Sequence, residues 1–296
     1  MPVAVARMWD AFDREVELSE EEFRLLRDFL HETFGLYFDD NSRSLLRSRL
    51  LGRLTTLDLG SFEDYYHYLR FGPQRAHELE SMVSHLTNNE TYFFREATQL
   101  RVFSDKVLPT LRERKLAAGE RRLRVLSAGC STGEEPLSLA MILLDSGQFF
   151  WNWDLQVVGM DIDATALDKA RRGLYFRNSF RSVEEALVAR HFTPEGTGQL
   201  VKESVRRLVT LRQGNLVERA SYAGLTALDA VFCRNVLIYF SDDSIRRSVQ
   251  IFFDCLAPGG YLFLGHAESL SRITDIFTPI RFQGALIYQK PPEVTQ

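Results

Sequence analysis

The stretch that decides the fold is Leu123-Arg-Val-Leu-Ser-Ala-Gly-Cys-Ser-Thr-Gly-Glu-Glu-Pro136, in which an apolar run leads through a turn into a helix start. Gly129 and Gly133 permit a tight turn and a close approach of the backbone to a ligand. Thr132 and Glu135 are expected to form a capping box, with Pro136 at the first helical position. The spacing is not GxGxxG, and two acidic residues at a helix N-terminus would repel a pyrophosphate. The stretch therefore predicts a strand, loop and helix that hold a neutral or cationic ligand, with a plain turn as the alternative.

Outward from this stretch, short β-rich apolar runs alternate with helical stretches, which is typical of a parallel α/β sheet. Strands are expected at residues 123–127, 156–160, 208–211, 227–233 and 261–264. Helices are expected at residues 136–144, 164–172 and 244–256, and a terminal hairpin at 277–282 and 284–289. The sequence thus predicts an α/β fold with a Rossmann-like sheet.

The part of the chain before this sheet carries helical apolar spacing and few β-branched residues. Ser19 and Glu22 form a capping-box pattern, and Gly35 supplies a helix stop. Further helices are expected at residues 41–54, 62–71 and 75–86. We therefore expect a helical domain at 1–88, a linker segment at 89–120 that contributes to a ligand cleft, and a sheet domain at 121–296.

Composition limits the classes of function that this chain can have. The chain has 296 residues, 45% of them hydrophobic and 26% charged, which excludes a disordered or low-complexity protein. Its formal net charge of −4 disfavours a general nucleic-acid-binding surface. The acidic first 22 residues do not resemble a signal peptide, and no apolar run approaches the roughly 18 residues of a membrane span. A cytoplasmic protein is expected.

The cysteines and histidines give no pattern of a metal site or a disulfide framework. Cys130, Cys233 and Cys255 are odd in number, widely spaced and outside any CxxC pair. They are expected to pack as small apolar residues. None of the six histidines has metal-ligand spacing beside a carboxylate, and His266 is expected to be structural. No metal is therefore expected.

Polar residues end two of the expected strands. Asp161 lies where α/β folds hydrogen-bond the hydroxyl pair of a ribose, and Asp163 is expected to cap the next helix. Arg234 and Asn235 end another strand, and either face a ligand or are satisfied by the local backbone. The glycine loop and the acidic strand end together indicate an adenosine ligand.

Two further segments, residues 87–96 and 41–56, have an unusual order or charge of side chains. Residues 87–96, Thr-Asn-Asn-Glu-Thr-Tyr-Phe-Phe-Arg-Glu, place polar residues before three aromatics, which favours a segment that packs its rings and lines a cleft over a plain linker. Residues 41–56 contain no acidic residue but four arginines, namely Arg43, Arg47, Arg49 and Arg53. This basic helix is either a solvated face or a docking surface for an acidic partner.

Taken together, these motifs resemble the chemotaxis receptor methyltransferases, the CheR family, from about Ser19 to Gln289. Five ordered elements carry the resemblance: residues 87–96, 127–136, Asp161-Ile-Asp163, Phe232-Cys-Arg-Asn-Val-Leu-Ile-Tyr-Phe240 and Gly265-His-Ala-Glu-Ser269. The resemblance implies an S-adenosylmethionine-dependent enzyme that methylates glutamate side chains of chemoreceptors, leaving S-adenosylhomocysteine.

Site residues follow from the resemblance position by position. The implied cofactor-binding residues are Asn89, Thr91, Arg95, Glu135, Asp161, Asn215, Leu216, Arg234 and Asn235. Arg95 is implied to lie beside the methionine end, and Tyr239 to border the reaction centre; both are assigned to catalytic positioning. The helical domain would dock the cytoplasmic helical region of a receptor through Arg43, Arg47 and Arg53.

One departure from the family and two alternatives accompany this assignment. The segment at about 192–211, equivalent to a β-insertion that grips a receptor tail in some relatives, is slightly short, so tail-peptide tethering is not expected. A nucleic-acid methyltransferase is one alternative, but the prolines of an Asn-Pro-Pro-Tyr loop are missing and Tyr239 lies one residue too far along. The other alternative is a non-catalytic adaptor that binds S-adenosylmethionine.

Overall fold

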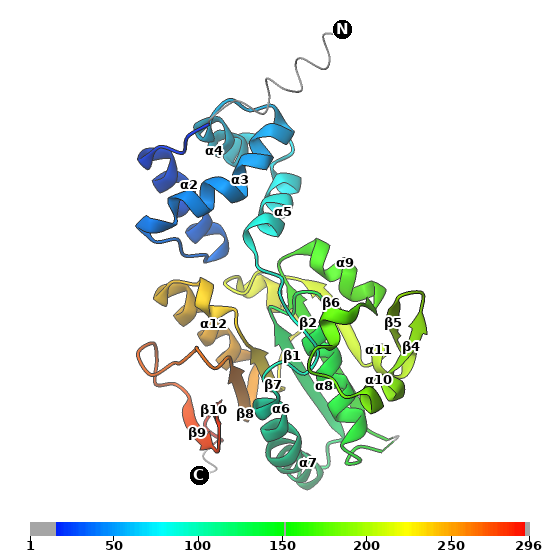
Figure 1. Ribbon diagram of the computed structural model, residues 1–296. Helices are drawn as coiled ribbons and strands as arrows, with labels where there is room; N and C mark the ends of the chain where they lie inside the picture. Colours follow the sequence, from blue (N-terminus) through cyan, green and yellow to red (C-terminus); the bar gives the residue numbers. More distant parts are fainter. Residues whose placement is uncertain (1–15, 151, 294–296) are drawn as a thin grey trace. The chain divides into compact units, whose positions relative to one another are not determined.

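Residues 16–150 and 152–293 are described by the computed structural model, in which the chain divides into two units, Met1–Asn88 and Asn89–Gln296 (Figure 1). The expectation drawn from the acidic first 22 residues falls largely on residues 1–15, which lie outside the described part. Across the described ranges, no helix is both long and apolar enough to cross a membrane.

The first unit is built from helices whose ends follow local sequence signals. Its elements are α2 (Glu20–Phe34), the 3₁₀ turn η1 (Asp40–Ser42), α3 (Arg43–Leu57), α4 (Phe62–Phe71) and α5 (Arg75–Leu86). The capping box of Ser19 and Glu22 is present, and Gly35 ends α2 in the left-handed conformation with φ 75°. The buried core of this unit includes Tyr65, Leu26 and Leu30 of α2, and Leu46, Leu50 and Leu54 of α3. The helices predicted for this region are therefore confirmed.

A seven-stranded sheet organises the second unit, in the order β6-β2-β1-β7-β8-β10-β9 (Figure 1). The strands are β1 (Arg122–Ala128), β2 (Asp154–Asp161), β6 (Val209–Gln213), β7 (Leu228–Cys233), β8 (Leu256–Leu264), β9 (Thr278–Phe282) and β10 (Ala285–Gln289). The first five pair in parallel, whereas β10 is antiparallel to both of its neighbours. The predicted strands, terminal hairpin and α/β class are confirmed.

Central strand β1 pairs with β2 on one side and with β7 on the other. The chain therefore leaves the centre of the sheet in two directions, which creates a topological switch point at the carboxyl ends of these strands. Ligands of open α/β sheets bind at such a point. The loops that follow β1, β2 and β7 are consequently the first place to look for a site.

Helices cover both faces of this sheet. They are α6 (Ala97–Val102), the π-helix η2 (Phe103–Val107), α7 (Leu108–Ala117), α8 (Glu134–Asp145), α9 (Ala164–Arg172) and α12 (Asp242–Cys255). Val125 and Val157 face a buried cluster that includes α7 and α8, whereas Leu126 and Val158 face a second cluster that includes α12. This alternation along the strands gives a three-layer arrangement.

A small antiparallel sheet of order β3-β5-β4 lies between β2 and β6 in the chain. It consists of β3 (Leu174–Tyr175), β4 (Phe192–Glu195) and β5 (Gly198–Val201), accompanied by the 3₁₀ turn η3 (Arg177–Phe180), α10 (Glu185–His191) and α11 (Glu203–Arg206). Its extent differs from the expected insertion at 192–211, because β3 begins earlier and residues 209–211 belong to β6 of the large sheet. Two-residue and four-residue strands give too short a pattern to be read from sequence.

Candidate functional site

The loop between β1 and α8 is shaped by glycine. Gly129 has φ 77°, and a Cβ placed on it would lie 2.4 Å from Cγ2 of Val236, so a side chain has no room here. The backbone amides of Gly129 and Cys130 both donate to the carbonyl oxygen of Met160, at 2.8 and 3.0 Å. The loop therefore lies against the end of β2 on one side and the segment after β7 on the other.

The predicted capping box at the start of α8 is wrong. Gly133, with φ 94°, is the N-cap residue, and no side chain caps the helix. Thr132 instead donates to the Glu134 carboxylate at 2.6 Å, while Glu135 accepts from Ser127 at 2.8 Å. Because glycine adopts this left-handed conformation freely, the helix begins one residue later than the threonine pattern indicated.

Asp161 ends β2 with its carboxylate directed at the neighbouring loop. Oδ2 accepts from the amide of Ser131 at 2.6 Å and Oδ1 from the amide of Asp163 at 2.9 Å. Burial raises the pKa of this carboxyl, although the backbone amides oppose the rise. The backbone amide of Ile162 also acts on this carboxylate, and since each oxygen can accept two hydrogen bonds, acceptor capacity remains for a further donor. This geometry fits the vicinal hydroxyls of a ribose.

Asn89 joins the linker to both loops. Its amide donates to Oδ2 of Asp163 at 2.7 Å, and its side-chain oxygen accepts from the Ser131 hydroxyl at 2.9 Å. Asp163 also accepts from the amides of residues 165 and 166, which confirms its predicted role as the cap of α9. Thr91 is half-buried on the same linker. The linker, the first loop and the end of β2 therefore meet at one place.

The segment after β6 completes this side of the site. The amide of Gly214 donates to the carbonyl oxygen of Asp161 at 2.9 Å, which ties the segment to the end of β2. Asn215 is buried and its amide donates to the Ser221 hydroxyl at 2.9 Å. Leu216 is also buried and packs in the cluster on the α12 side of the sheet. Both residues thus follow directly on the residue that contacts Asp161.

Arg234 lies at the centre of a buried ionic network. Its side chain is 2% exposed, donates to Glu135 at 3.1 Å, pairs with Glu96 at 3.4 Å and also donates to the carbonyl oxygen of Arg95. Its Nε has no hydrogen-bond partner among the described residues. Burial raises the pKa of Glu135 although Arg234 opposes the rise. The guanidinium therefore organises protein groups around the Glu135 carboxylate, which is 16% exposed.

Two glutamates that the sequence analysis left without a role hold the segment after β7. Glu96 has φ 54° and accepts from the side chain of Asn235 at 3.1 Å. Burial alone would raise the pKa of Glu96, but Arg234 and Asn235 hold it below its ordinary value. Glu268 accepts from the backbone amide of Asn235 at 2.9 Å, and burial raises its pKa. Asn235, which both glutamates contact, lies 139 residues from Glu96 and 33 residues from Glu268 in the chain.

Arg95 and Tyr239 lie at the edges of this network. Arg95 donates to the carbonyl oxygen of Glu90 at 3.0 Å, with its guanidinium carbon 5.9 Å from the centre of the Tyr92 ring. Tyr239 is 40% exposed and belongs to the 3₁₀ turn η5 (Leu237–Tyr239). No hydrogen bond joins the two side chains in the part of the chain that the structure describes. Both are accessible for an added ligand or substrate.

The aromatic residues of the linker pack as the sequence predicted. Phe93 lies 4.8 Å from the ring of Tyr175, 5.4 Å from Phe180 and 5.0 Å from Phe192, measured between ring centroids. Its amide donates to the carbonyl oxygen of Ser179 at 2.9 Å. The linker is therefore anchored on the small sheet and the turn beside it.

The cysteines are buried and free. Burial raises the pKa of the Cys130 and Cys233 thiols well above the ordinary range, which makes both poor nucleophiles at neutral pH and supports a packing role. Among residues 16–150 and 152–293, no group of three or more His, Cys, Asp or Glu side chains could hold a metal ion.

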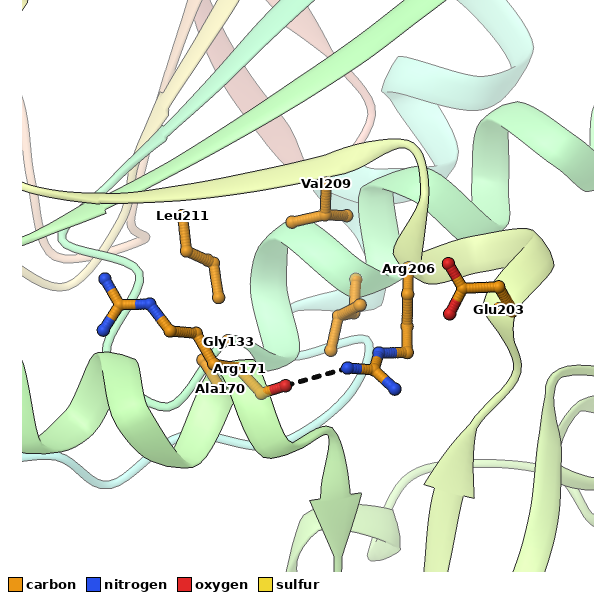
Figure 2. A pocket seen from close by; sticks show the side chains of 8 residues that line it. Gly133, Ala170, Arg171, Glu203, Arg206, Val209 and Leu211 are labelled. Carbon is orange, nitrogen blue, oxygen red and sulfur yellow. Dashed lines mark hydrogen bonds between the residues drawn. The ribbon is translucent and has the colours of Figure 1, made fainter.

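A cavity of about 350 Å³ opens beside Gly133, between α8, α9, α11 and β6 (Figure 2). Figure 2 shows Arg206 on its wall, donating to the carbonyl oxygen of Arg171 at 3.0 Å. None of the site residues predicted from the sequence lines this cavity. Gly133, which lines it, belongs to the loop between β1 and α8.

In the first unit, the basic helix α3 does not present all its arginines alike. Arg53 donates to the Glu78 carboxylate at 2.9 and 2.6 Å and is only 14% exposed. Arg49 donates to the carbonyl oxygens at the end of α5, and Arg47 donates to Val16 at 2.9 Å. Arg43 is exposed. The prediction that Arg53 belongs to an open docking surface is therefore not supported by its surroundings.

Comparisons with known proteins agree with this arrangement. Residues 21–87 match the family model described as "CheR methyltransferase, all-alpha domain", and residues 89–285 match "CheR methyltransferase, SAM binding domain". The chain is 37% identical to "Chemotaxis protein methyltransferase 2" of Vibrio cholerae over 94% of this chain and 95% of that protein. It is 34% identical to "Chemotaxis protein methyltransferase" of Escherichia coli K12 over 92% of this chain and 91% of that protein.

Proposed function

Since the chain belongs to the CheR methyltransferase family and is an S-adenosylmethionine-dependent methyltransferase, we propose that it methylates glutamate side chains of chemoreceptors. The product would be a glutamate methyl ester on the cytoplasmic helical region of the receptor. The observation that carries the proposal is the meeting of three segments, where Asp161 and Asn89 both contact Ser131.

The residues at this meeting point fit the parts of S-adenosylmethionine. Asp161 has acceptor positions for the ribose hydroxyls, and Asn215 with Leu216 lies beside it for the adenine. The partly exposed Glu135 carboxylate suits the positively charged methionine end. Asn89 and Thr91 approach from the linker, and Arg95 follows them.

The chemistry requires little proton transfer from the protein. A glutamate side chain has an ordinary pKa of about 4.3, so the acceptor is already ionised at neutral pH and needs no general base. Bound S-adenosylmethionine supplies an activated methyl group on its sulfonium. What the protein must supply is alignment and exclusion of water, and positioning of this kind contributes up to about 7 to 11 kcal/mol. We assign this role to Arg95 and Tyr239.

Receptor docking is proposed for the basic helix of the first unit. A receptor surface rich in glutamate would meet Arg43, which is exposed, and Arg47, which is 28% exposed and lies 3.6 Å from Glu17. Exposed charges of this kind act mainly on the rate of association, and salt screens them. Arg53 supports the helix from within through Glu78.

A labelling experiment tests the function directly. The protein is incubated with S-adenosylmethionine that carries a radioactive methyl group and with membranes that contain candidate receptors, and the receptors are then treated with alkali. Release of volatile labelled methanol identifies a carboxyl ester. Label that resists alkali would contradict a glutamate ester, and absence of any label with a cofactor that binds would favour an adaptor.

A further inference from the structure

Glu268 gathers four backbone amides onto one carboxylate. Oε2 accepts from Gly265 at 2.6 Å and from Asn235 at 2.9 Å. Oε1 accepts from Val236 at 2.9 Å and from Ile238 at 3.3 Å. Three of the four donors belong to the segment that leads from β7 to Tyr239. An ionised carboxylate only accepts hydrogen bonds, and each of its two oxygens can accept two. Hydrogen bonds to a charged acceptor are shorter and stronger than those between neutral groups.

Other contacts of this segment are concentrated at Leu237, which is 3% exposed and lies in the buried cluster on the α12 side of the sheet. Asn235 has φ 59°, a left-handed conformation that residues other than glycine rarely adopt. After it comes the single turn η5, in which Leu237 is buried but Ile238 is 51% exposed and Tyr239 is 40% exposed. Leu237 anchors the turn in the core, whereas the exposed side chains of Ile238 and Tyr239 contribute little packing, so their backbone positions depend on hydrogen bonds.

Glu96 acts on the same segment in a different way. It accepts from the side-chain amide of Asn235 at 3.1 Å and lies 3.4 Å from Arg234. These contacts hold side chains, whereas Glu268 holds the backbone amides of residues 235, 236 and 238. Val236 in turn lies against Gly129 of the first loop. The conformation that Glu268 fixes is thus fitted to the loop beside the proposed cofactor site.

We propose that Glu268 is a positioning residue that fixes the backbone from Asn235 to Tyr239, so that Tyr239 is held at the border of the methyl acceptor. The inference rests on the proposed function in one respect, namely that Tyr239 borders the acceptor. Glu268 itself contacts neither the cofactor nor the substrate in this scheme and acts through the segment it holds.

The informative variant is Glu268→Gln, which keeps the size of the side chain. A glutamine has one oxygen acceptor and an NH2 group, so it can satisfy at most two of the four amides and turns donors toward the others. Glu113→Gln is the matched control, because Glu113 is an exposed glutamate on α7 and its change removes the same charge.

Amide hydrogen exchange on the full chain gives a readout independent of activity. In Glu268→Gln, exchange in residues 235–240 should accelerate at least about tenfold, while the core strands β1 and β7 keep wild-type protection. Wild-type protection of residues 235–240 would overturn the proposal. Equal acceleration throughout the second unit would also overturn it, because it would show a general structural role.

Kinetics then test the route through Tyr239. With receptor membranes, Glu268→Gln should lower kcat at least about tenfold, equal to about 1.4 kcal/mol, with the Kd of S-adenosylmethionine changed less than about threefold. In a protein that already carries Tyr239→Ala, Glu268→Gln should lower kcat little further. The effects of two residues that act through the same step are not additive. Equal losses in both backgrounds, or a kcat equal to that of Glu113→Gln, would overturn the inference. Failure of the proposed function is distinguishable, because the wild-type protein would then yield no alkali-labile label at all.

Discussion

Replacing Arg53 with alanine should destabilise the first unit far more than any other arginine change on α3. The Arg53 guanidinium makes two hydrogen bonds to Glu78, at 2.9 and 2.6 Å, and Tyr65 donates to the same carboxylate at 2.6 Å. Glu78 is 2% exposed. The variant would therefore leave a buried carboxylate with a single neutral donor.

The magnitude follows from the desolvation of that carboxylate. Removing one partner of a buried ion pair costs about 3 to 5 kcal/mol, and the 14% exposure of Arg53 leaves little solvent to screen the loss. Arg43→Ala, at an exposed position, should change stability by less than about 0.5 kcal/mol. In a double-mutant cycle, Arg53→Ala and Glu78→Ala should couple by at least about 1.5 kcal/mol.

Hydrogen exchange of peptides from α3 and α5 measures the opening free energy of this unit within the full chain. An opening free energy for Arg53→Ala within about 1 kcal/mol of wild type would refute the reasoning. So would a loss of equal size in Arg43→Ala. Because Arg53 supports the fold, slower receptor methylation by Arg53→Ala would not by itself measure receptor docking.

Three other changes have distinct expected results. Asp161→Ala should weaken S-adenosylmethionine binding by roughly 1.5 to 3 kcal/mol through loss of charge-assisted hydrogen bonds, and calorimetry that finds unchanged affinity in a folded variant would remove the ribose assignment. Arg95→Ala should abolish methyl transfer with a melting temperature near wild type, since its side chain has one described hydrogen bond, to Glu90; a large drop in melting temperature with activity retained would mark it as structural. Arg43→Ala with Arg47→Ala should slow receptor methylation and flatten its salt dependence without altering cofactor affinity, and a wild-type rate across a salt series would show a solvated face.

Much of the fold could be predicted from the sequence because its signals are local. The ends of α4 and α9 were predicted at the residue because Gly72-Pro73 and Gly173 follow them directly. The large sheet was predicted because each strand is a short apolar run between turns. The small sheet was expected only at about 192–211, and its first strand β3 lay outside that range because two-residue and four-residue strands give little pattern.

The site could be predicted only where a role depends on near neighbours. Asp163 caps the helix that begins at the next residue, so its spacing identified it. Glu135 instead meets Arg234, 99 residues away, and Arg53 meets Glu78, 25 residues away. Such ion pairs are created by the packing of elements, and nothing in the spacing of one helix indicates whether a charge faces water or a buried partner.

The contacts of the linker also determine when, during synthesis of the chain, this part of the structure can form. Asn89 meets a partner 74 residues later, and the carbonyl oxygen of Arg95 meets Arg234, 139 residues later. At ribosomal rates of about 5 to 20 residues per second, the second partner emerges roughly 7 to 28 s after Arg95. The ring of Phe93 gains its partners Tyr175, Phe180 and Phe192 earlier in that interval, but the carbonyl oxygen of Arg95 gains Arg234 only at its end. A chain released before residue 234 would leave this contact of the linker unmade, so the proposed cofactor site is complete only after residue 234 has emerged.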